Sequence, residues 1–128
     1  MRSSPAGRRP SAESYPPRDG GYLPPNSIFV GEVDAQTLVD AESSELRLIE
    51  VTFKQGARNK LHTHTTDQIL LITEGRGIVA TATEQHEVEP GDIAVIPTGE
   101  PHWHGARPGE DMTHLSFTGK SRTTIVGE

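Results

Sequence analysis

The sequence predicts an all-β fold, closed as a sandwich or a barrel, and three observations support this prediction. From Ser27 onward the chain consists of short apolar runs rich in Val, Ile, Thr and Phe, the composition of half-buried strands. Gly, Pro and Asp turns separate these runs at close and even spacing, which is typical of sandwiches and barrels. The chain shows no internal repeat and no dinucleotide-binding fingerprint.

The expected strands, in chain order, are residues 28–33, 46–53, 61–64, 68–74, 77–82, 86–88, 93–96, 102–105, 112–117 and 123–126. Residues 35–45 form the one stretch that could hold a helical turn. Residues 75–77 (Gly-Arg-Gly) are expected to form a hairpin turn, and residues 89–92 (Glu-Pro-Gly-Asp) a β-turn with proline at its second position.

Residues 1–26 hold six of the ten prolines, with serine, glycine and arginine between them. Such a composition supplies little for a core, so a disordered or loosely ordered N-terminal arm is expected here. The alternative is a strand that is added to a partner subunit and anchored by Tyr15 and Tyr22. Residues 27–128 are expected to form a single domain, because this length suffices for one stable core.

The absence of cysteine excludes disulfides, thiolate metal sites and a cysteine nucleophile, and it fits a reducing cytoplasm. No apolar run approaches the roughly 20 residues that span a membrane. The beginning of the chain also lacks the apolar segment of a secretory signal. A cytoplasmic protein without a membrane partner is therefore expected.

The charge is unevenly distributed along the chain. Residues 1–26 carry four arginines against Glu13 and Asp19, which gives them a net charge of +2. Because the whole chain has a net charge of −6, the remaining residues carry a net charge of −8. An acidic body of this kind argues against a nucleic-acid backbone as the partner. A small molecule is the expected ligand.

Two histidine pairs, His62-Thr-His64 and His102-Trp-His104, stand thirty-eight residues apart. On an extended strand, His-x-His spacing places both imidazoles on one face, with their Cα atoms about 7 Å apart. That is close enough for both imidazoles to reach one ion. The pairs therefore predict a metal site at the edge of a small β-barrel.

The residues around these pairs resemble the two signature motifs of the cupin superfamily, and the resemblance extends over residues 46–118. The first motif is represented by Gly56, His62, His64, Gln68 and Gly75, and the second by Gly91, Pro97, Gly99, His102 and Ala106. Two positions depart from the pattern: glutamate is usual at Gln68, and asparagine is usual at Ala106. The resemblance implies a double-stranded β-helix (jelly-roll) barrel that commonly forms homodimers. Apolar residues on both faces of strand 46–53 agree with a strand covered on two sides.

The resemblance also implies that His62, His64, Gln68 and His102 hold one divalent metal. Imidazoles with one amide oxygen suit manganese, which is the first choice, and also iron, nickel or zinc. One alternative is a barrel that has lost its metal. Another is that Gln68 points aside, with water in its place and Asp67 compensating.

His104 and His114 are the candidate catalytic residues. Strand alternation places His104 on the face of His102, and His114 on the face of Met112 and Ser116. Histidines beside a metal can act as general base and acid near neutral pH. The alternatives are a hydrogen bond that orients a ligand residue and, for His104, a fifth ligand position.

A narrower resemblance, carried by Gln68, residues 102–106 and residues 112–115, is to the manganese-dependent cupin hydroxynitrile lyases. These enzymes join or split hydrogen cyanide and an aldehyde. The leading hypothesis is therefore a metal-dependent lyase or isomerase with a histidine general base. The alternatives are an oxygen-dependent dioxygenase or oxidase of the quercetinase-like type, a non-catalytic small-molecule-binding cupin, and a polyketide cyclase.

Other conspicuous residues are expected to be structural. His86 lies in a charged hairpin and is expected to be solvated. Trp103 faces away from the metal by strand parity, toward packing or a dimer contact. Arg58 and Lys60 could attract an anionic substrate, although surface solvation is the ordinary interpretation, and Arg107 is equally ambiguous.

Overall fold

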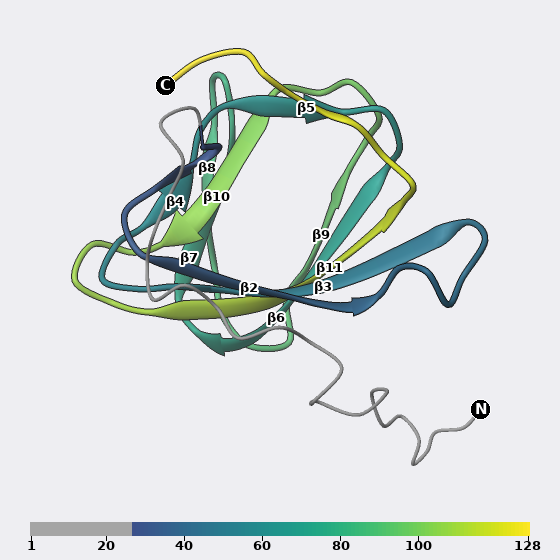
Figure 1. Ribbon diagram of the computed structural model, residues 1–128. Coiled ribbons are helices and arrows are strands. Elements are labelled where there is room, and N and C mark those ends of the chain that lie inside the picture. The colour runs from purple at the N-terminus through teal and green to yellow at the C-terminus, as the bar shows by residue number, and fades with distance from the viewer. Residues whose placement is uncertain (1–26) are drawn as a thin grey trace.

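Two curled antiparallel sheets face each other in the computed structural model, which describes residues 27–128 (Figure 1). The arm expected for residues 1–26 lies outside the described residues. One sheet runs in the order β2 (Val33–Val39), β3 (Leu46–Phe53), β11 (Met112–Gly119), β6 (Gln68–Gly75) and β9 (Ile93–Ile96). The other contains β1 (Phe29–Val30), β4 (Arg58–Asn59), β10 (His102–Ala106), β5 (His62–His64) and β12 (Thr123–Ile125), with β7 (Gly77–Thr81) and β8 (Gln85–Val88) beyond β10.

The expected all-β class is confirmed, but the helical turn considered for residues 35–45 is wrong. Residues 35–39 of that stretch belong to β2, which pairs with β3 from Val33 to Val39, and the remaining residues form a turn and bends. The inward side chains of Val33 and Leu38 are buried, so burial against the sheet decides the conformation. Among residues 27–128 no helix is long and apolar enough to cross a membrane.

Two strand boundaries also differ from expectation. Residues 28–33 do not form one strand, because Gly31 adopts a positive φ of 92° and separates β1 from β2. The turn at residues 75–77 is not a hairpin, because β6 pairs with β9 and β11 whereas β7 pairs with β8 and β10. This turn carries the chain from one sheet to the other. The β-turn at residues 89–92 is confirmed by the bond from Asp92 N to Glu89 O, at 3.0 Å.

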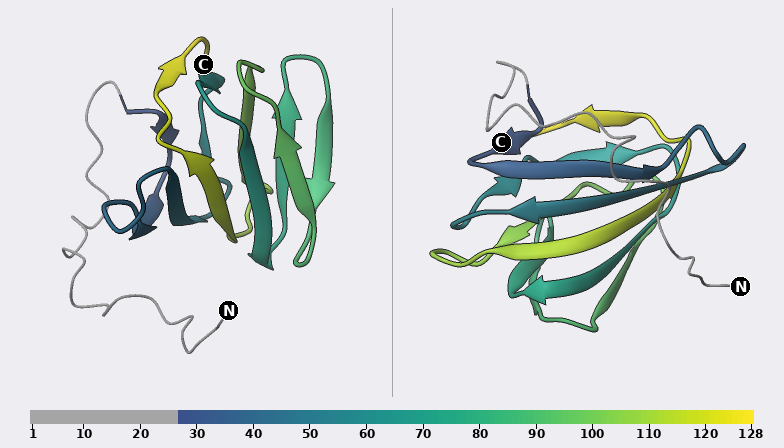
Figure 2. Two further views of the ribbon diagram at one scale, coloured as in Figure 1. Left: turned by 90° about the vertical axis from the view of Figure 1, so that its right-hand side faces the viewer. Right: turned by 60° about the horizontal axis from the view of Figure 1, so that its bottom comes forward.

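The apolar core fills one end of the space between the sheets. Phe53, Ile72 and Met112 are almost fully buried there, together with Val51 and Ala57. The strands run side by side between the two ends of the molecule (Figure 2), so residues that are paired across strands lie at the same distance from the core. His114 lies opposite Val51 and Ile72, next to the core, whereas Thr118 lies opposite Arg47 and Gln68, toward the other end.

Candidate metal centre and active site

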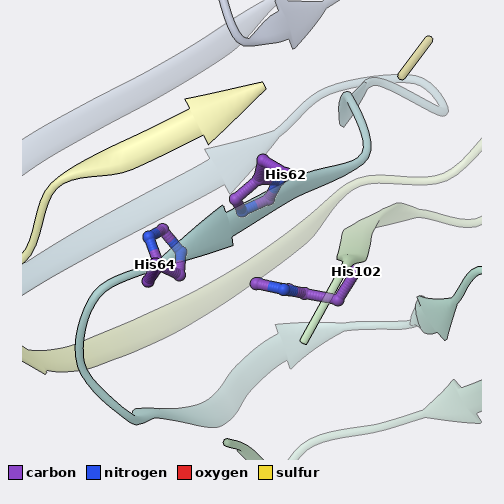
Figure 3. Close-up of side chains that lie close together, drawn as sticks. All are labelled: His62, His64 and His102. Carbon is purple, nitrogen blue, oxygen red and sulfur yellow. The ribbon is translucent and has the colours of Figure 1, made fainter. Parts of the chain in front are cut away.

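Neighbouring strands bring three of the predicted ligands together. His62 and His64 share one face of β5, and His62 lies directly opposite His102 of β10. Figure 3 shows the three imidazoles turned toward a common point. One nitrogen from each of these histidines lies within 4.8 Å of the other two, so the group could hold a metal ion.

Backbone carbonyls fix which nitrogen faces that point. The Nδ1–H of His62 donates to Lys60 O at 2.5 Å, and the Nδ1–H of His102 donates to Glu100 O at 2.9 Å. Because a carbonyl can only accept, each Nδ1 carries the hydrogen and each Nε2 keeps its lone pair. Nδ1 of His64 lies 3.0 Å from Thr123 Oγ1, which leaves its buried Nε2 without a hydrogen-bond partner among the described residues.

Gln68 supplies the fourth group. Its Nε2 donates to Ser116 Oγ at 2.8 Å, and its Oε1 lies 3.0 Å from Nε2 of His102. In this orientation two acceptors face each other, an arrangement that a cation between them would stabilise. The facing acceptors of Gln68 and His102 and the unpartnered Nε2 of His64 are groups that a divalent metal ion could bind. These residues therefore fit a divalent metal. Gln68 therefore does not point aside, and Asp67 instead accepts bonds from N and Oγ1 of Thr98.

Burial keeps the three histidines neutral. It lowers the pKa of His62 to about 3 and that of His64 to about 4, and it also lowers the pKa of His102. Positive charge on His102 would lower the pKa of His64 further, while the nearby side chain of Gln68 acts to raise it. At neutral pH the lone pairs are therefore available to a metal without loss of a proton.

The two candidate catalytic histidines form a second pair. Nε2 of His114 lies 3.0 Å from Nδ1 of His104, and both rings are buried. Asn59 accepts the backbone N–H of His104 through Oδ1 at 2.8 Å, which directs its Nδ2–H toward Nε2 of His104 at 3.3 Å. The tautomers that satisfy the most groups have His104 donating from Nδ1 to Nε2 of His114.

This arrangement places the hydrogen of His114 on Nδ1, which has no hydrogen-bond partner among residues 27–128. Burial lowers the pKa of His114 to about 4, and burial followed by the charge of His114 lowers the pKa of His104 well below its usual range. Both imidazoles are therefore neutral at pH 7. The pair can donate a hydrogen bond to a ligand through Nδ1 of His114, and this atom can take up a proton only after its own hydrogen has been transferred.

One cavity of about 320 Å³ joins the two groups. His62, His64 and Gln68 line it, as do His104 and His114. Much of its remaining wall is apolar and comes from Ile28, Phe29, Ala35, Ile49, Val51 and Phe53. Its size suits a small molecule, and its wall favours an uncharged carbon skeleton.

Sequence reasoning missed two residues of this site. Asn59 follows the first glycine of the metal motif, and only its burial beside His104 reveals its contact. Arg47 lines the cavity from β3, yet nothing near it in sequence marks it as part of a site. The Ser116 hydroxyl, which shares its strand face with His114, supports the amide of Gln68.

Several residues expected to be structural have structural contacts. The guanidinium of Arg58 lies 5.7 Å from the ring centroid of Trp103, outside the cavity. His86 is largely exposed beside Glu84. Arg107 pairs with Glu87 and Glu110. Arg58 and Arg107 are absent from the lining of the cavity, and so is Lys60, whose carbonyl instead accepts the hydrogen of His62.

Comparison with known proteins agrees with this geometry. The cupin domain family matches residues 49–118. The chain is 39% identical over 95 residues to an (R)-mandelonitrile lyase of Granulicella tundricola, covering 73% of this chain and 72% of that protein.

Among solved structures, a cupin-like protein of Thermotoga maritima matches with a TM-score of 0.77 and 28% identity, over 87% of this chain and 88% of that one. A polyketide cyclase of Streptomyces resistomycificus shares the fold, with a TM-score of 0.66 and 23% identity over 76% of this chain and 74% of that one. These comparisons confirm the family that the sequence motifs indicated. The chain therefore belongs to the cupin family.

Proposed function

We propose that this protein is a metal-dependent lyase that makes or breaks a carbon–carbon bond beside a hydroxyl or carbonyl group, as in cyanohydrin cleavage. One observation carries the proposal: a single cavity is lined both by three of the four candidate ligands, His62, His64 and Gln68, and by the histidine pair. The fourth candidate, His102, lies 3.0 Å from Oε1 of Gln68. The similarity to an (R)-mandelonitrile lyase supports this reaction class.

His62, His64, Gln68 and His102 would hold the ion, with manganese as the proposed metal. A bound divalent ion would supply Lewis acidity toward a substrate oxygen. The ligand set determines how strong this effect is, because Gln68 coordinates through a neutral oxygen. Three histidines and a glutamine leave the full +2 charge at the site, whereas a glutamate would reduce it to +1.

The histidine pair would move the proton. Cyanohydrin cleavage releases the hydroxyl proton, breaks the bond to the nitrile carbon and protonates the departing cyanide. Nδ1 of His114 gives its hydrogen to the departing cyanide and takes the hydroxyl proton in return, so the protonation of the pair is unchanged over the cycle. Nδ1 of His114 is the proposed exchange atom, because it has no partner among the described residues. Asn59 positions His104 and does not itself exchange the proton.

The experiment measures benzaldehyde release from mandelonitrile by the manganese-loaded protein and by its His114→Ala variant. Because positioned acid–base groups contribute about 100-fold to 10,000-fold, His114→Ala should lower kcat by at least about 100-fold. His86→Ala is the matched control, since this exposed histidine lies outside the cavity.

Metal content must stay the same in both variants, so that a loss of rate reports on the proton transfer. Equal rates for the wild type and His114→Ala, or no turnover by a protein with full metal occupancy, would refute the proposal. Consumption of oxygen by the metal-loaded protein would instead favour the dioxygenase alternative. Ligand binding without any turnover would favour a binding protein.

A further inference from the structure

Arg47 is the one charged side chain among the described residues that line the cavity, and the metal centre does not use it. It projects from the inward face of β3, and its side chain is 27% exposed. A guanidinium in a largely apolar wall loses hydration, so its position there needs a compensating role. The contacts of Arg47 show how much of its hydrogen-bonding capacity is free.

Two of the five guanidinium N–H groups have partners. Nε donates to Asp40 Oδ1 at 3.3 Å, and Nη1 donates to Ser121 O at 3.1 Å. The other three N–H groups have no hydrogen bond within residues 27–128. These free donors include both hydrogens of Nη2, and they lie on a planar fork that matches a carboxylate.

The negative charges near Arg47 lie outside the cavity. Asp40 Oδ1 also contacts Lys120 Nζ at 2.6 Å, so one carboxylate is shared by two cations. The exposed Glu42 directs Oε1 to the backbone N–H of Asp40. Neither acid lines the cavity, so the cavity wall offers no carboxylate to the free N–H groups of Arg47.

Arg47 stands at the level of the metal centre. Strand pairing places it opposite Thr118, and Thr118 opposite Gln68. Two strand spacings separate the Cα atoms of Arg47 and Gln68 by roughly 10 Å, and both side chains reach inward. A ligand only a few bonds long could therefore touch the metal with one end and the guanidinium with the other.

We propose that Arg47 is a specificity-determining residue that binds a substrate carboxylate, so that the substrate class is a short oxo- or hydroxy-acid. Arg47 would form a two-pronged contact with the carboxylate, while the carbonyl or hydroxyl oxygen lies at the metal centre. A phosphate is a poorer match, since a dianion beside this apolar wall has only one lining cation to balance it. Only one part of this inference rests on the proposed function, namely the placement of the ligand's carbonyl or hydroxyl oxygen at the metal centre.

The test compares 4-oxopentanoate with 2-pentanone, which have five carbons and one ketone each and differ in the carboxylate. Their dissociation constants are measured calorimetrically with manganese-loaded protein at fixed ionic strength, so that screening is equal. A charge-assisted contact predicts that the acid binds about tenfold or more tightly than the ketone. Arg47→Met should abolish this preference, and Arg47→Lys should retain only part of it.

Arg107→Met is the matched control, because Arg107 is similarly exposed and ion-paired but lies outside the cavity. It should keep the wild-type preference. Equal binding of both probes by the wild type, binding of neither, or a preference that survives Arg47→Met would overturn the inference. Mandelonitrile carries no carboxylate, so its turnover judges the proposed lyase activity separately. Equal binding by the wild type would overturn the inference without any variant, and the partial preference expected of Arg47→Lys tests the role of Arg47 even if Arg47→Met unfolds.

Discussion

Each histidine of the metal centre is oriented by a contact on the side away from the common point. Backbone carbonyls of Lys60 and Glu100 hold His62 and His102, and a threonine hydroxyl lies at Nδ1 of His64. Such contacts fix the tautomer and the ring orientation before any ion binds. The structure therefore brings the ligand set together in a preorganised form, while its metal binding stays a prediction.

Replacement of His62 by alanine should abolish metal binding at this centre. Loss of a supporting contact alone costs up to about 100-fold in metal affinity, so loss of a ligand should cost more. Metal analysis of purified protein after incubation with manganese should show about one ion per wild-type chain and almost none for His62→Ala. His86→Ala should retain the wild-type content, and equal occupancy in His62→Ala would place the metal elsewhere.

The buried histidines also predict how stability depends on pH. An ordinary histidine titrates near 6.5, whereas burial lowers the pKa of His62 to about 3 and the pKa values of His64 and His114 to about 4. Between these values the unfolded chain binds more protons than the folded chain, so the free energy of unfolding falls as pH falls. The urea midpoint of chelator-treated protein should therefore decline from about pH 7 to about pH 4.5.

His114→Gln should reduce the slope of this decline, because glutamine does not titrate. The carboxylates of Asp40 and Asp67, whose pKa values are lowered from 3.8, lose their contribution only at still lower pH. The two windows are therefore separable. A urea midpoint that stays constant between pH 7 and pH 4.5 would mean that the histidines are not neutral in the fold.

At the scale of elements, glycine turns set where a strand leaves one sheet for the other. Gly75 ends β6 with a φ of 70°, and a Cβ there would lie 2.0 Å from Asp111 O. Gly91 has a φ of 96°, but a Cβ there would meet nothing within 4 Å. Both positions disfavour a side chain through φ, and only Gly75 adds a backbone collision.

Gly75→Ala should therefore destabilise the protein much more than Gly91→Ala. The positive φ alone costs about 1–2 kcal/mol, which is the loss expected for Gly91→Ala. Gly75→Ala must in addition move the backbone around Asp111. Its decrease in melting temperature should therefore be several times that of Gly91→Ala. Thermal denaturation followed by circular dichroism measures both losses. Equal losses would show that the sheet crossing accommodates a methyl group without strain.

At the scale of the whole molecule, the outer face of the five-stranded sheet carries several exposed apolar side chains. Exposed members of this face are Leu46, Ile69, Ile93, Val95 and Phe117. Phe117 and Ile69 are direct neighbours, and so are Ile69 and Val95, so the patch is continuous across strands. Contiguous exposed apolar side chains of this kind are typical of interaction surfaces, so we expect a partner on this face.

A second copy of the chain is the expected partner on this face, as the family resemblance already implied. The patch itself is uncharged, which matters because the acidic bodies of two copies would repel each other elsewhere. A two-fold dimer buries the same surface on both copies. Light scattering on a sizing column should give a dimer for the wild type and a monomer for Val95→Lys. Gln85→Lys, on the other sheet, should remain dimeric, and a monomeric wild type would contradict the prediction.

The all-β class and the histidine pairs were accessible from the sequence because they depend on local spacing. Alternation along a strand places His62 and His64 on one face whatever the rest of the fold does. The motif spacing then linked this pair to His102 through family resemblance. The exposed character of His86 and the outward direction of Trp103 also followed from their immediate neighbours.

Tertiary structure alone decided which distant residues complete the site. Asn59 contacts His104 across 45 residues of sequence, and Gln68 contacts Ser116 across 48. The place of Arg47 depends on the register between β3 and β11. Register is set jointly by the burial of many side chains, and a slip of one residue would turn Arg47 and His114 outward. No local pattern encodes that choice, so the sequence determined the candidate metal ligands and the candidate catalytic histidines, and the packed barrel determined the contacts between them and the place of Arg47 in the cavity wall.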